Sequence, residues 1–112
     1  MLFYTLPIGE KEYKLRLNTR NVIVLEKTLG CNPLSIFGKD DEPVIPTVTS
    51  MVAILHASLQ QYQHGITMND AFELFDGWLM DGNTPADFVP VIIEIYKVSG
   101  LISTVEDNEE KN

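Results

Sequence analysis

The longest helix is predicted from residues 47–63, whose sequence is TVTSMVAILHASLQQYQ. Apolar side chains recur in this stretch at intervals of three and four residues, which places them on one face of an α-helix. Gly65 follows as a stop signal. The apolar face comprises Val48, Met51, Val52, Leu55, Leu59 and Tyr62. An amphipathic helix of this kind packs such a face against the rest of its fold.

Two strands are predicted before this helix, within residues 2–17. Residues 2–6 (LFYTL) are rich in β-favouring side chains, and residues 12–17 (EYKLRL) alternate between apolar and polar. The intervening residues 7–11 predict a hairpin turn, with Gly9 at a position of positive φ. Because an isolated hairpin is marginal in water, we expect its apolar face to pack on the helices.

Four further helices are predicted from cap and stop residues, at about 19–29, 33–37, 68–80 and 86–98. Pro90 leaves the start of the last one open, because a proline in a helix interior breaks a hydrogen bond. That helix either starts near Asp87 or bends at Pro90. Residues 39–46, which contain two prolines, are predicted to form a polar linker.

These elements predict a mainly α fold, a small helical bundle with an N-terminal β-hairpin. We expect one domain over residues 1–102, because a chain of 112 residues has the length of a single domain. Residues 103–112 are mostly acidic and polar, so we expect them to form a disordered acidic tail.

The charge of the chain narrows its possible partners. Sixteen acidic and eight basic side chains give a formal charge of −8, which repels a phosphate backbone, so we expect no nucleic-acid partner. The apolar runs are far shorter than the roughly 20 residues that span a bilayer, so we expect no membrane partner. Cys31 is the one cysteine, which excludes an internal disulfide and is typical of a reducing compartment.

The sequence contains no set of side chains that predicts an active site. His56 and His64 stand eight residues apart without the further ligands that a metal site needs. Glu73 and Asp76 are paired carboxylates on one predicted helix, but no histidine or lysine accompanies them, and a solvated acidic face explains them. We therefore expect no catalytic residue, no cofactor, no metal and no enzymatic activity.

Aromatic side chains are the best candidates for binding a partner. Phe72, Phe75 and Trp78 form a stripe on the predicted helix 68–80. This stripe is either plain core or the edge of a groove for a partner helix. Aromatic anchors carry much of the binding energy at such sites. On side-chain chemistry alone, Tyr62 and Tyr96 complete the predicted set of partner-binding residues.

Three parts of the sequence carry a family resemblance. The first is residues 20–34 (RNVIVLEKTLGCNPL), the second is residues 54–60 (ILHASLQ) with Tyr62 and residues 64–67 (HGIT), and the third is residues 95–100 (IYKVSG). Their order, spacing and total length resemble the small tail assembly chaperones of long-tailed, non-contractile phages and prophages of Gram-positive bacteria. The resemblance covers about residues 3–102 and rests on caps, glycines and core positions.

The resemblance implies a function in phage tail assembly. Proteins of that family bind the long, helical, aggregation-prone tape measure protein in the cytoplasm of the bacterial host. They keep it soluble, help to bring tail tube protein subunits to it, and are absent from the finished virion. Many are also made in a longer form by a programmed frameshift, and self-association along the client is a further expectation.

Two other functions compete with this interpretation. One is a structural protein of the virion, such as a tail or head-completion protein, which would be found in purified particles. The other is a small regulatory adaptor or an antitoxin, which would bind one compact partner.

Overall fold

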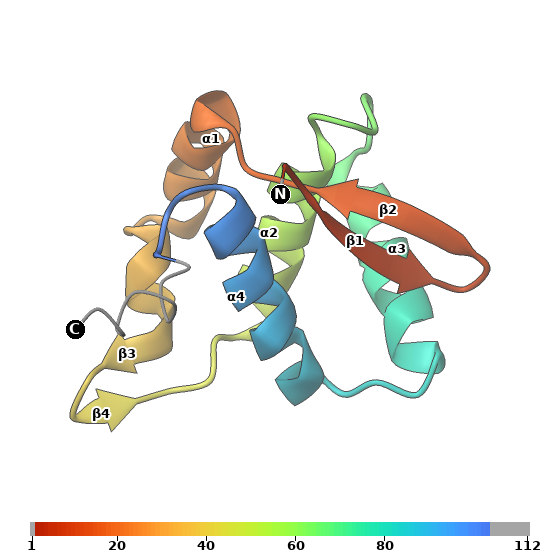
Figure 1. Ribbon diagram of the computed structural model, residues 1–112. Coiled ribbons are helices and arrows are strands. Elements are labelled where there is room, and N and C mark those ends of the chain that lie inside the picture. Colours follow the sequence, from red (N-terminus) through yellow and green to blue (C-terminus); the bar gives the residue numbers. More distant parts are fainter. Residues whose placement is uncertain (1, 104–112) are drawn as a thin grey trace, which may run out of the picture.

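The computed structural model describes residues 2–103, which form four α-helices, two short 3₁₀ helices and two small β-hairpins (Figure 1). In chain order the elements are β1 (Tyr4–Ile8), β2 (Lys11–Leu15), α1 (Thr19–Leu29), η1 (Pro33–Phe37), β3 (Gly38–Lys39), β4 (Glu42–Pro43), α2 (Val48–Leu59), α3 (Met68–Met80), η2 (Pro85–Asp87) and α4 (Phe88–Val98). The predicted class, mainly α with an N-terminal hairpin, is confirmed. The predicted tail lies outside the described residues, apart from Ser103.

The N-terminal hairpin is tighter than predicted. β1 and β2 pair antiparallel with Ile8 opposite Lys11, so that only Gly9 and Glu10 form the loop. Gly9 has a φ of +63°, which a two-residue hairpin loop with glycine in first place requires. The Gly9 N–H donates a hydrogen bond of 2.7 Å to Asp81 Oδ2, which fixes the tip of the hairpin to the end of α3.

The first helix begins and ends where its caps predict. The Asn18 side chain accepts a hydrogen bond from the Asn21 N–H, and Gly30 closes α1 in the left-handed conformation. Residues 39–46 differ from the predicted linker, because β3 and β4 pair within them to form a second hairpin. Two hydrogen-bonded residues on each strand are too few to leave a strand pattern in the sequence.

Helix α2 contacts α1, α3, α4 and β2, and it is the centre of the fold. It ends at Leu59, four residues before the predicted end. The side-chain amide of Gln60 donates to the backbone oxygens of His56 and Ile66, and the Gln63 N–H donates to the Leu59 oxygen. The Gln60 side chain thus bonds a carbonyl of the last helical turn and also the chain beyond Gly65, while the Gln63 backbone N–H satisfies a second carbonyl of that turn.

Helix α3 starts as its cap predicts, whereas α4 starts two residues after the predicted residue 86. Thr67 and Asp70 form the capping box of α3. A 3₁₀ turn at Pro85–Asp87 precedes α4, which starts at Phe88. Pro90 is therefore in the first turn of α4, where a backbone N–H has no helical partner and its absence costs nothing. Of the two alternatives, the start near Asp87 is the one observed.

The core lies where α2, α3 and α4 meet under the first hairpin. β2 packs on α2, and β1 packs on α3 and α4 (Figure 1). The largest fully buried side chains of the core include Leu15, Leu17, Leu25, Met51, Ile54, Leu55, Leu59, Phe88, Ile92, Ile95 and Tyr96. No helix within residues 2–103 is both long enough and apolar enough to cross a membrane.

Candidate functional site: an apolar groove between three helices

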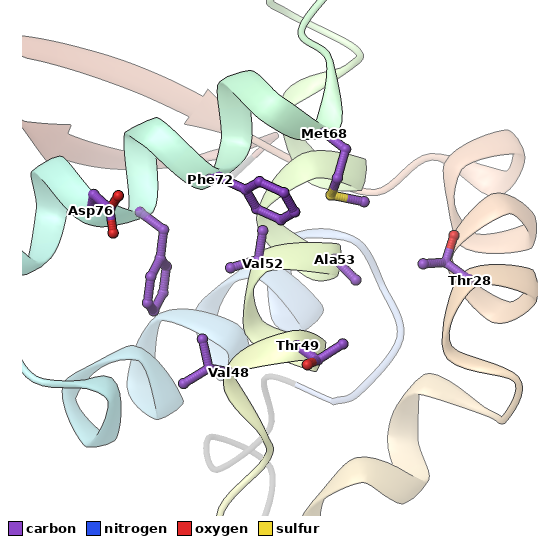
Figure 2. A pocket seen from close by; sticks show the side chains of 9 residues that line it. Thr28, Val48, Thr49, Val52, Ala53, Met68, Phe72 and Asp76 are labelled. Carbon is purple, nitrogen blue, oxygen red and sulfur yellow. The ribbon is translucent and has the colours of Figure 1, made fainter.

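An apolar groove of about 410 Å³ opens between α1, α2 and α3. Figure 2 shows α2 between the other two helices, with Thr28 facing the groove from α1 and Phe72 facing it from α3. The lining residues are Thr28, Val48, Thr49, Val52, Ala53, Met68, Phe72, Phe75 and Asp76. The geometry follows from spacing, because positions 48, 49, 52 and 53 of one helix share a face.

Phe72 is the most prominent apolar side chain of the groove. It is 52% exposed, although it lies on a helix whose next aromatic residue, Phe75, is 3% exposed. Val48, on the α2 side, is 47% exposed. Val44 and Ile45, in the segment that enters α2, are exposed as well. A half-exposed aromatic ring beside exposed aliphatic side chains is typical of a surface that a partner covers.

One charged side chain lines the groove. Asp76 lies one turn after Phe72 on the same helix (Figure 2). Within residues 2–103 its carboxylate has no ion pair, and the ion pair found there joins Lys97 to Glu94. An apolar groove with an unpaired carboxylate on its wall suits an amphipathic segment that carries a lysine or arginine beside its apolar side chains.

The structure separates the five predicted partner-binding residues. Phe72 and Phe75 line the groove, the first at its surface and the second at its base. Trp78 is buried and packs edge-on against Phe88, with ring centroids 5.2 Å apart. Tyr62 packs on Phe3 of the N-terminal segment, with centroids 5.5 Å apart, and does not line the groove.

Tyr96 is fully buried and has a structural contact of its own. Its hydroxyl donates a hydrogen bond of 2.9 Å to the Pro33 backbone oxygen, which joins α4 to η1. Burial, and to a smaller extent the nearby Cys31 thiol, raises the pKa of Tyr96 far above its ordinary value. Neither Tyr96 nor Trp78 therefore offers a surface to a partner in this conformation.

The other candidate groups from the sequence do not form one centre. Glu73 lines a pocket beside Tyr13 and Asp70, whereas Asp76 lines the groove, so these two carboxylates do not share a pocket. Across the part of the chain that the structure describes, no three His, Cys, Asp or Glu side chains are grouped so that they could hold a metal ion.

Residues 3–112 match a family of unknown function, DUF6096. The chain belongs to that family. None of the curated proteins and none of the solved structures matches it. For this DUF6096 protein the case for a function therefore rests on the sequence resemblance and on the groove with its chemistry.

The sequence identifies only part of this groove. The apolar periodicity places Val48 and Val52 on the core face of α2, but it does not reveal that the cover over them is incomplete. Thr28 can be assigned to the groove only from the packing of α1 against α2. Met68 is the first residue of α3, and a side chain at that position points back beyond the start of the helix. It is therefore not part of the predicted aromatic stripe.

Proposed function

We propose that the protein is a tail assembly chaperone of a long-tailed, non-contractile phage or prophage of Gram-positive bacteria. It binds the tape measure protein in the cytoplasm of the bacterial host, keeps it soluble and helps to recruit tail tube subunits. It does not remain in the mature virion. The proposal rests on the resemblance over residues 3–102 and on one structural observation, the apolar groove with its half-exposed Phe72.

The groove supports a helical client for reasons of shape and chemistry. Its floor is one helix and its walls are two others, so a further helix can lie in it with apolar side chains at intervals of three and four residues. Covering the exposed half of Phe72 removes about 100 Å² of apolar surface from water and contributes about 2 kcal/mol. A lysine or arginine on the client can pair with Asp76.

The test is the solubility of a tape measure protein from a phage of this kind. We expect it to stay soluble when co-expressed with the full chain and to precipitate alone. Phe72→Ser removes the exposed ring and should weaken the complex at least about tenfold, by the loss of that buried area. Met80→Ser is the matched control, because Met80 is also on α3, is 86% exposed and does not line the groove.

The outcomes test the chaperone function and the role of the groove separately. A tape measure protein that is equally insoluble with and without the chain would contradict the chaperone function. Full solubility with a folded Phe72→Ser variant would leave the function standing and reject the groove. Detection of the chain in purified virions would favour the structural tail or head-completion protein instead.

A further inference from the structure

A second pocket, of about 510 Å³, lies where the start of α1 meets the end of α2. Its polar lining includes Arg20 and Asn21 from α1, with His56, Gln61 and His64 from α2 and the turn after it. None of the described side chains that line this pocket is acidic. Acidic side chains are thus absent from the lining, although the whole chain has a formal charge of −8.

Asn21 is the first sign that this pocket has a ligand. Its side chain lines the pocket although the residue is only 8% exposed. Its backbone N–H donates to Asn18 Oδ1 at 2.9 Å, but its carboxamide has no hydrogen-bond partner within residues 2–103. The carboxamide atoms themselves open into the pocket, so its oxygen and NH₂ group are available there to bind a ligand.

Further donors surround the same space. Gln61 accepts a hydrogen bond of 3.3 Å from Arg16 Nη1 through its oxygen, which leaves its NH₂ group available as a donor. The Arg20 guanidinium is at the start of α1, where the positive end of the helix dipole also favours an anion.

The pocket also contacts the end of α2, where several backbone carbonyl groups are already hydrogen-bonded within the protein. The His56 oxygen accepts from Gln60, the Ser58 oxygen from the Arg16 N–H, and the Leu59 oxygen from Gln63. Three carbonyls of that last turn are thus occupied within the protein. The free hydrogen-bonding capacity of the pocket is mainly on the donor side.

We propose that this pocket binds a carboxylate, either on an acidic side chain of a partner protein or on a small organic acid. A carboxylate can accept bonds from the Arg20 guanidinium and from the carboxamides of Asn21 and Gln61. The negative field of the whole chain disfavours a doubly charged phosphate more than a singly charged carboxylate. This inference is independent of the groove and of the proposed function.

The test is an NMR titration of the full ¹⁵N-labelled chain at constant ionic strength, observed at the side-chain NH₂ groups of Asn21 and Gln61. The probes are N-acetylglycine, an acetylated and amidated Gly-Glu-Gly peptide, and inorganic phosphate, so that each carboxylate probe carries one negative charge. We expect saturable shifts with both carboxylates. Arg20→Gln should weaken binding at least about fivefold, as expected for a lost charge-assisted hydrogen bond. Lys27→Gln, which removes the same charge from an exposed position on α1 outside the pocket, should change it less than about twofold.

Each outcome either tests the proposal or identifies the source of the carboxylate. No saturable shift, or an equal loss in the two variants, would overturn it, since the second result means only a general charge effect. Tighter binding of phosphate than of both carboxylates would overturn the ligand class. If the carboxylates bind, tighter binding of the peptide identifies a protein segment as the source, and tighter binding of N-acetylglycine identifies a small acid.

Discussion

Gly38 holds a backbone conformation that residues with a side chain avoid. Its φ is +81° and its ψ is −158°, and a Cβ there would lie 2.6 Å from the Glu42 backbone oxygen and 3.0 Å from the Val44 nitrogen. We expect Gly38→Ala to lower the free energy of unfolding by about 3 kcal/mol, from backbone strain together with this overlap. Urea denaturation followed by circular dichroism measures the loss.

Gly30 provides the matched control at the same scale. It also has a positive φ, of +73°, but a Cβ there would meet no atom within 4 Å. Gly30→Ala should therefore lower the free energy of unfolding by about 1 kcal/mol, from the strain of the left-handed backbone alone. Equal losses in the two variants would show that the β3–β4 turn does not constrain Gly38. The sequence predicts Gly38 as a helix stop, but not the close approach of residues 42–44, which arises only when the second hairpin forms.

At the scale of elements, the cap of α3 makes stability depend on pH. Hydrogen bonds from the Thr67 backbone N–H and hydroxyl hold the pKa of Asp70 below its ordinary value of 3.8. Because this pKa is lower in the folded than in the unfolded chain, the ionised carboxylate stabilises the fold above pH 3.8, and that contribution is lost as the pH falls through the folded value.

Asp70→Asn tests this dependence, because asparagine keeps an acceptor oxygen and removes the charge. The variant should be less stable than the parent near neutral pH, and the difference should narrow below pH 3.8. Glu73→Gln removes a carboxylate from the same helix at a position outside the cap, and its effect should not follow this pattern. A difference in stability between the parent and Asp70→Asn that stays constant with pH would contradict the role assigned to the charge.

The helices were predictable because their signals are local. Asn18 and Gly30 bound α1, and Thr67 with Asp70 starts α3, so the bounds of both helices follow from neighbouring residues. The end of α2 was not predictable, since it depends on where the Gln60 side chain finds the Ile66 oxygen. Periodicity likewise assigns aromatic residues to a face, but it does not distinguish the exposed Phe72 from the buried Trp78.

At the scale of the whole molecule, both pockets are products of packing that no single stretch of sequence encodes. The groove combines positions from 28 to 76, and the polar pocket combines residues 18–24 with residues 56–64. The two pockets differ in chemistry because α1 contributes Thr28 near its end to one and Arg20 and Asn21 near its start to the other. The two proposed sites thus lie at opposite ends of the same helix.

The charge of the whole molecule predicts how salt affects its stability. Residues 2–103 carry twelve acidic and seven basic side chains, and they contain one ion pair, between Lys97 and Glu94 at 3.7 Å. Repulsion among unpaired carboxylates therefore outweighs attraction, and screening should favour the compact state. Raising sodium chloride from low concentration to about 0.3 M, where the screening length falls below about 8 Å, should raise the Tm by a few degrees. Sodium chloride is the appropriate salt, because sulfate stabilises proteins by exclusion from their surface as well. A Tm that falls with sodium chloride would mean that attractive ion pairs hold the fold together.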